Sequence, residues 1–235
     1  MISPHAGYRY SGAVAGAAYR QVIVPEVVVL LGIGHRPTVR PNVIGLTGHW
    51  QTPLGAAPID AGLAEAIHAA TDLLAPDQGE QRDEHSLELQ LPFLQHRNPD
   101  VRIVPIQVRD ATPERCRVIG EAIADVITRW PTPALLVAST DLHHQQSAPG
   151  LDPPTIVPQM DQVAIDRILA FDPEGLYADV RSRGVTMCGL LPTTMALHAA
   201  KRLGATSVQE VEHATSYEIS GSSSYVVGYL SAVVR

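Results

Sequence analysis

Short β-branched runs alternate with helical segments along the middle of this chain, and their order restricts the fold more than any other feature. The runs 27–31, 101–108 and 134–138 have the length and composition of buried strands. Helical patterns lie at 61–70 and 114–130. Alternation of strands and helices is typical of a sheet covered by helices, so the sequence predicts an α/β fold.

Further elements are predicted on either side of these segments. Leu87, Leu91 and Leu94 repeat at helical spacing and predict one helix. Residues 140–159 are rich in proline and predict a long loop. Helices are expected at 159–170, 174–183 and 190–203, the last closed by Gly204, and a hairpin of two strands at 207–215 and 224–234. No repeat or linker divides the sequence, so we expect a single domain over residues 1–235.

Charge and composition argue against several classes of partner. The 235 residues include 17 basic and 24 acidic side chains, a net charge of −7, which argues against nucleic-acid binding and anionic membranes. No stretch approaches the roughly 18 apolar residues of a membrane span, and no secretory signal is evident at the start. Two cysteines cannot form a disulfide framework. We therefore expect a cytoplasmic protein with reduced thiols.

The sequence has 10 histidines, and several of them follow predicted strand ends. Ligands of open α/β sheets bind beyond the carboxyl ends of the strands. His35 follows the first predicted strand, and Asp141 and His144 follow the third. His5 lies in a Pro/Gly turn after a short strand-like stub. These residues are therefore candidates for a shared site.

Cys188 directly precedes the helix predicted at 190–203. A helix N-terminus favours a thiolate, so we expect a lowered pKa for this thiol. Two histidines and one anionic ligand leave open coordination positions, as in non-haem iron oxygenases when the anion is a carboxylate. No spacing here identifies a metal site by itself, and His-Glu-x-x-His and Cys-x-x-Cys are absent. On spacing alone, turn histidines and an inert buried thiol stay as alternatives.

Five motifs occur together along the chain. They are Pro4-His5-Ala6-Gly7-Tyr8, Leu31-Gly32-x-Gly34-His35, Asp83-Glu84-His85-Ser86, Ser139-Thr140-Asp141-Leu142-x-His144 and Cys188-Gly189. In this order they resemble the Memo family, which includes protein B of the AmmeMemoRadiSam system and is related to class III extradiol dioxygenases. The resemblance covers nearly the whole chain and implies a LigB-like three-layer α/β/α sandwich. It also implies that the family's usual segment ahead of Pro4, with a first strand, is missing here.

The resemblance implies a metal centre. His5, His35 and Cys188 match the three metal-ligand positions, and His144 matches the acid/base of the related dioxygenases. Those dioxygenases carry a glutamate in place of Cys188. A thiolate is a softer ligand and shifts the metal preference toward copper(I), zinc or a differently tuned iron. The resemblance implies iron(II) first, with copper or zinc as the alternatives.

Two other residues are candidate catalytic groups beside His144. Asp141 is placed either to orient His144 or to cap the loop. His85 is placed either to orient a ligand histidine or to support the start of a helix. We expect His143 to face solvent, because adjacent loop histidines point apart, and we assign His213 no special role.

Three functions follow as hypotheses. The first is a metal-dependent oxidoreductase in which His144 moves protons. The second is a non-catalytic module that keeps the pocket and binds a peptide, a small molecule or a metal ion. The third is a role as a partner in an RNA or protein modification pathway. The family's gene neighbourhood suggests it, because family members occur together with radical SAM and AMMECR1-like proteins, which would be the partners.

Overall fold

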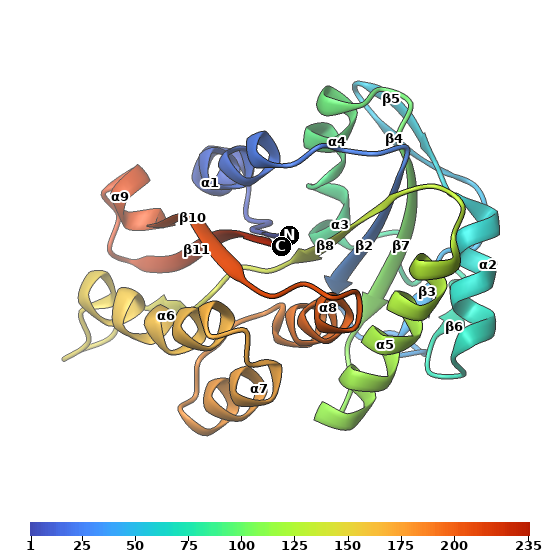
Figure 1. The fold of residues 1–235 in the computed structure, drawn as a ribbon. Helices are drawn as coiled ribbons and strands as arrows, with labels where there is room; N and C mark the ends of the chain where they lie inside the picture. Colours follow the sequence, from blue (N-terminus) through green and yellow to red (C-terminus); the bar gives the residue numbers. More distant parts are fainter.

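A nine-stranded mixed sheet runs through the centre of the computed structural model, which describes residues 1–235 (Figure 1). Its strands are β1 (Ile2–Ser3), β2 (Val27–Ile33), β3 (Val43–Ile44), β6 (Ala75–Pro76), β7 (Arg102–Val108), β8 (Ala134–Ser139), β9 (His144–Gln146), β10 (Val208–Thr215) and β11 (Tyr225–Val234). The order is β10-β11-β1-β8-β2-β7-β3-β6, with β9 paired to β11. Because β1, β8, β2 and β7 are mutually parallel, their carboxyl ends meet at one edge. A separate hairpin joins β4 (His49–Thr52) and β5 (Gly55–Pro58).

Helices cover both faces of the sheet. They are α1 (Tyr8–Gln21), α2 (Ala61–Ala70), α3 (His85–Glu88), α4 (Leu91–Arg97), α5 (Pro113–Arg129), α6 (Pro153–Leu169), α7 (Pro173–Ser182), α8 (Leu190–Arg202) and α9 (Ser216–Ser220). Successive side chains of a strand point to opposite faces. Val29 and Leu31 accordingly pack in the core under α2, α5 and α8, whereas Val28 and Leu30 pack against α1, α3 and α4. The predicted three-layer α/β/α sandwich is confirmed.

The helix predicted from the leucine spacing is divided into two. Leu87 lies in α3, whereas Leu91 and Leu94 lie in α4, and Gln90 stands between them. Pro92 has no N–H to donate to the carbonyl four residues earlier, so one continuous helix is not available. The three leucines still enter the same core.

The long loop predicted at 140–159 is shorter than expected. Residues 144–146 form β9, and α6 begins at Pro153. Proline is well accommodated in the first helical turn, where the backbone N–H has no intrahelical partner, so these prolines start a helix. No helix combines the length and apolar character that crossing a membrane requires.

The two C-terminal strands pair antiparallel, as predicted. Their connection is not a simple Ser/Gly turn, because α9 lies within it. Thr215 and Glu218 form a capping box that starts this helix. Gly204 has φ of +91° directly after the C-cap residue of α8, which confirms its role in ending that helix.

Candidate functional site

The ends of β1 and β8 are joined by one buried carboxylate. The Asp141 carboxylate accepts hydrogen bonds from the backbone N–H groups of His5 at 2.8 Å and Ala6 at 3.2 Å. Two roles were expected for Asp141, orienting His144 or capping a loop. The contacts seen here are those of a loop cap, and the loop is the one that carries His5. Burial is the main cause of the raised pKa of this carboxyl. Asp141 therefore fixes the backbone from which His5 projects.

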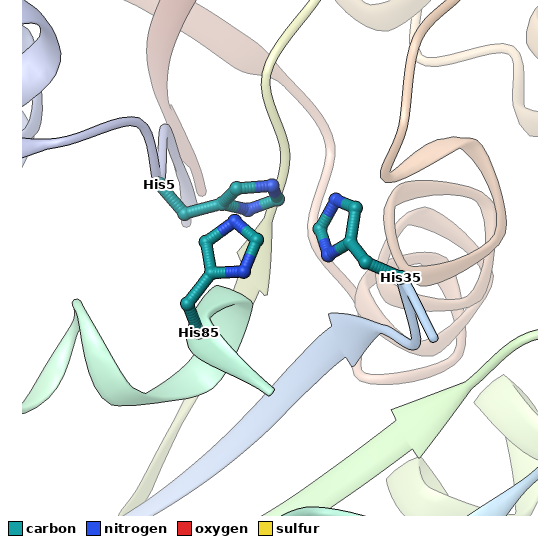
Figure 2. Close-up of side chains that lie close together, drawn as sticks. All are labelled: His5, His35 and His85. Atoms are coloured by element: carbon teal, nitrogen blue, oxygen red, sulfur yellow. The ribbon is translucent and has the colours of Figure 1, made fainter. Parts of the chain in front are cut away.

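Three imidazoles converge at the carboxyl edge of the sheet (Figure 2). His5 follows β1, His35 follows β2 and His85 is the first residue of α3. One ring nitrogen from each lies within 4.8 Å of the others. The rings of His35 and His85 stack with centroids 4.4 Å apart, and both meet the ring of His5 edge-on. The structure thus brings together the two predicted histidine ligands and the predicted catalytic residue His85.

Cys188, in the segment before α8, contacts one of these three imidazoles, that of His5. Its Sγ lies 3.1 Å from Nε2 of His5 and 3.2 Å from the backbone nitrogen of Asp141. The next residue, Gly189, leaves no room for a side chain, because a Cβ there would lie 2.4 Å from Cβ of Thr140. This close approach of the chain to β8 holds the thiol against His5.

The charge state of the cluster follows from burial. Desolvation, followed by the proximity of His35 and His85, holds the pKa of His5 well below its usual value, so its imidazole is neutral at pH 7. The expectation of a lowered pKa for Cys188 is wrong. Burial and the neighbouring Asp141 carboxylate raise the pKa of this thiol and outweigh the hydrogen bonds from backbone N–H groups. Without a metal ion Cys188 is a thiol.

Glu84 organises His35 and the start of α3. Its carboxylate caps α3 by accepting from the backbone N–H of Ser86 at 2.8 Å, and it accepts from the backbone N–H of His35 at 2.6 Å. Nδ1 of His35 lies 2.8 Å from the same carboxylate and Nδ1 of His85 3.4 Å. Burial alone would raise the pKa of Glu84, but the hydrogen bonds from His35 and Ser86 lower it to about 2. The ionised carboxylate makes Nδ1 of His35 a donor, so that in the neutral ring the lone pair is on Nε2.

The position of His144 is set by Thr186. Nδ1 of His144 lies 3.1 Å from the carbonyl oxygen of Thr186, which can only accept, so Nδ1 carries the proton and Nε2 is free to accept one. The ring lies 6.2 Å from that of Tyr225. The prediction for His143 is wrong, because this side chain is only 4% exposed and Nδ1 accepts from the backbone N–H of Thr186. Pairing of β9 with β11 turns His143 inward.

Several structural contributors to the site were not identified as site residues from the sequence. Ser139 and Gln90 contact the His5 region, and Thr186 holds His144. The fully buried Asp161 accepts from the backbone N–H of His143 at 2.8 Å and pairs with His213 at 2.9 Å. His213, which was assigned no special role, therefore has a buried partner. Only Ser139 stood within a motif, so the others could not be found from spacing.

Glu84 also lines a polar cavity of about 510 Å³. Its lining includes Trp50, Gln51, Arg82 and Glu88, but none of the three clustered histidines. His35 and His85 lie at the surface edge, with side chains exposed by 33% and 50%, whereas His5 is buried behind them. A small molecule can therefore reach them from solvent.

Comparisons with known proteins agree with the motifs. A sequence model described as "Memo-like protein" matches residues 1–233. The chain is 38% identical to a MEMO1 family protein of Caldivirga maquilingensis over 234 residues, 98% of this chain and 81% of that protein. It is 35% identical to a MEMO1 family protein of Methanopyrus kandleri over 239 residues, covering 100% and 82% of the two chains.

The fold has a solved counterpart with a distant sequence. The crystal structure of an uncharacterized protein from Escherichia coli K12 superposes with a TM-score of 0.52 at 14% identity, covering 93% of this chain and 90% of that one. At this identity the likeness concerns the fold alone. The family match over nearly the full length and the close relatives establish that the chain belongs to the Memo-like protein family.

Proposed function

We propose that this Memo-like protein is a metal-dependent oxidoreductase whose ion is held by His5, His35 and Cys188. The observation that supports it is the convergence of three imidazoles with ring nitrogens within 4.8 Å of one another and a thiol 3.1 Å from one of them. Histidine nitrogen and cysteine sulfur are ligands for transition metals rather than for magnesium or calcium. His85 is placed to act as a further donor.

The hydrogen bonds around the cluster fit metal binding. Ligand histidines usually donate their second ring N–H to a carboxylate, carbonyl or other acceptor, which fixes the tautomer. His35 donates to Glu84 in this way, and its Nε2 is free. The Cys188 thiol must lose its proton on metal binding, so affinity is expected to rise with pH. We propose iron(II) as the resident ion, with copper or zinc as the alternatives that a thiolate ligand favours.

A bound iron or copper ion would supply Lewis-acid and redox chemistry. The chain itself offers a base, since in the neutral ring of His144 the hydrogen bond to Thr186 leaves the lone pair on Nε2. Asp141 and Glu84 hold the His5 and His35 backbones in place. We assign proton transfer to His144 and positioning to the two carboxylates.

Cobalt(II) binding tests the ligand set directly. A cysteine thiolate bound to cobalt(II) gives a near-ultraviolet charge-transfer band, so we expect this band in the wild type and its loss in Cys188→Ser. Cys116→Ser is the matched control, because Cys116 lies on the buried face of α5, within the core, and is not a proposed ligand. Persistence of the band in Cys188→Ser would contradict the proposed ligand. Oxygen consumption by the iron- or copper-loaded protein, with ascorbate as electron donor, tests the redox role.

A non-catalytic binding module is the second candidate. It is favoured by exposed tyrosines near the cluster, since Tyr8 is 47% exposed and Tyr225, beside His144, is 52% exposed. Aromatic side chains are common anchors for peptides and small molecules. Under this proposal the site around His5 and His144 would hold a peptide or a small molecule, or the protein would act with radical SAM and AMMECR1-like partners. Saturable ring opening of catechol by the metal-loaded protein would exclude it.

A further inference from the structure

A buried chain of side-chain hydrogen bonds lies behind His5. Its centre is Gln90, between α3 and α4, whose side chain is fully buried. Oε1 of Gln90 accepts from the hydroxyl of Tyr19 at 2.9 Å, and Nε2 donates to the carbonyl of Pro4 and to Oγ of Ser139, both at 2.9 Å. The Pro4 carbonyl can only accept, so the orientation of the Gln90 amide is fixed.

The Ser139 hydroxyl has a single proton and two lone pairs. Its oxygen lies 2.5 Å from the carbonyl of Ser86, which can only accept, so the Ser139 proton is used there. Gln90 Nε2–H occupies one lone pair of the same oxygen. The remaining neighbour is Nδ1 of His5 at 2.9 Å. Nδ1 of His5 must therefore be the donor.

This assignment fixes the tautomer of His5. With the proton on Nδ1, the lone pair of the neutral ring is on Nε2, the atom that lies 3.1 Å from Sγ of Cys188. The opposite tautomer would direct an N–H at the cluster and could not bind a metal ion through Nε2. The ring of Tyr19 is itself held by stacking on Phe93, with centroids 5.2 Å apart and planes within 3°.

We propose that Ser139 and Gln90 are positioning residues that select the metal-binding tautomer of His5. Ser139 provides the acceptor. The Ser86 carbonyl and Gln90 together hold the Ser139 hydroxyl so that a lone pair, and not the proton, faces the ring of His5. Neither residue has to touch the ion or a substrate. The role in metal binding rests on the proposed function. The tautomer of His5 can be measured in the metal-free protein and does not depend on it.

Long-range ¹H–¹⁵N NMR of the histidine rings in metal-free, full-length protein tests this proposal, with His5 assigned through His5→Gln. We expect the Nδ1–H tautomer in the wild type. Ser139→Ala removes the acceptor and should move His5 to the Nε2–H form. Gln90→Met, which removes one of the two contacts that hold the Ser139 hydroxyl in place, should give a mixture of the two forms. Ser3→Ala is the matched control, because Ser3 is a buried serine two residues from His5 whose hydroxyl has no partner.

Cobalt(II) titration of the same proteins provides the second readout. Loss of a group that orients a ligand typically lowers metal affinity about 10- to 100-fold, so we expect this loss in Ser139→Ala and none in Ser3→Ala. An unchanged His5 tautomer in Ser139→Ala, or an Nε2–H form in the wild type, would overturn the positioning role. A wild type that shows the expected tautomers but binds no cobalt would overturn the proposed metal function and leave the tautomer selection intact.

Discussion

At the scale of single residues, Glu84 controls two of the clustered imidazoles. Its carboxylate holds the backbone and Nδ1 of His35 and lies 3.4 Å from Nδ1 of His85. Its own position is fixed because it caps α3. The Glu84 side chain thus both caps α3 and orients His35, a proposed metal ligand.

Replacing Glu84 by glutamine should lower both stability and metal affinity. The neutral amide weakens charge-assisted hydrogen bonds, each worth about 2 kcal/mol, and we expect metal affinity to fall about 10- to 100-fold. Cobalt(II) titration and chemical denaturation measure the two effects. Asp83→Asn is the control, since the neighbouring side chain is 69% exposed. Equal losses in both variants would contradict a specific role for Glu84.

The sequence predicts which residues gather at the site better than it predicts how they are oriented. His5, His35 and Asp141 could be placed together because they follow strands that end at one edge. The partners Gln90 and Thr186 could not, because their roles depend on side-chain hydrogen bonds between segments distant along the chain. The sequence also predicted a lowered pKa for Cys188, whereas burial raises it. Burial of this thiol depends on distant segments and leaves no local pattern in the sequence.

At the scale of elements, the contact between α5 and α8 supports the segment that carries Cys188. Gly120 of α5 lies against the backbone of α8, and a Cβ there would be 2.4 Å from the carbonyl oxygen of Met195. Because this neighbour is backbone, it cannot move aside without shifting the helix. The glycine therefore sets the distance between the two helices.

Gly120→Ala should destabilise the protein by about 2 kcal/mol, the usual range for overpacking a core. Urea denaturation measures the change in the free energy of unfolding. Gly12→Ala in α1 is the matched control, because its Cβ would meet only Cβ of Tyr8 at 3.5 Å. In a helix this exchange is expected to stabilise by up to about 1 kcal/mol. Equal stability of Gly120→Ala and the wild type would contradict the packing account.

Elements were predictable where a regular pattern is long. The helix at 61–70 has the predicted bounds, and the strands beginning at Val27 and Ala134 are present. The short elements β9 and α9 were not predicted, because three to five residues carry no measurable periodicity. Both lie in connections whose conformation depends on pairing with β11 or packing against it.

In the molecule as a whole, residues as far apart in the sequence as His5 and Cys188 meet at one site. They do so because the parallel strands of the sheet end at one edge. The N-terminal strand β1 lies between β8 and β11, which brings both ends of the chain together in Figure 1. A second buried link, between Asp161 of α6 and His213 of β10, ties the C-terminal hairpin to the loop that carries His144.

This link should make stability depend on pH. The hydrogen bond to Asp161, with contributions from Glu210 and Glu218, raises the folded-state pKa of His213 above 6.5. A histidine with a raised folded-state pKa stabilises fully below its unfolded pKa and loses that contribution as the pH rises through the folded pKa. The free energy of unfolding should therefore fall above about pH 6.5. This fall should be smaller in His213→Gln and unchanged in His96→Gln, an exposed control on α4. Identical pH profiles of the free energy of unfolding for His213→Gln and the wild type would contradict the stabilising role of the His213–Asp161 pair.

Every proposed role depends on metal binding by His5, His35 and Cys188. The decisive measurement is the metal content of protein purified without oxygen and reconstituted with iron(II), by elemental analysis of the wild type, His5→Ala, Cys188→Ala and His96→Ala. We predict about one ion per chain in the wild type and His96→Ala, and loss of the ion in the other two, as expected when a ligand is removed. A wild type that stays metal-free, or equal metal content in all four proteins, would contradict the claim.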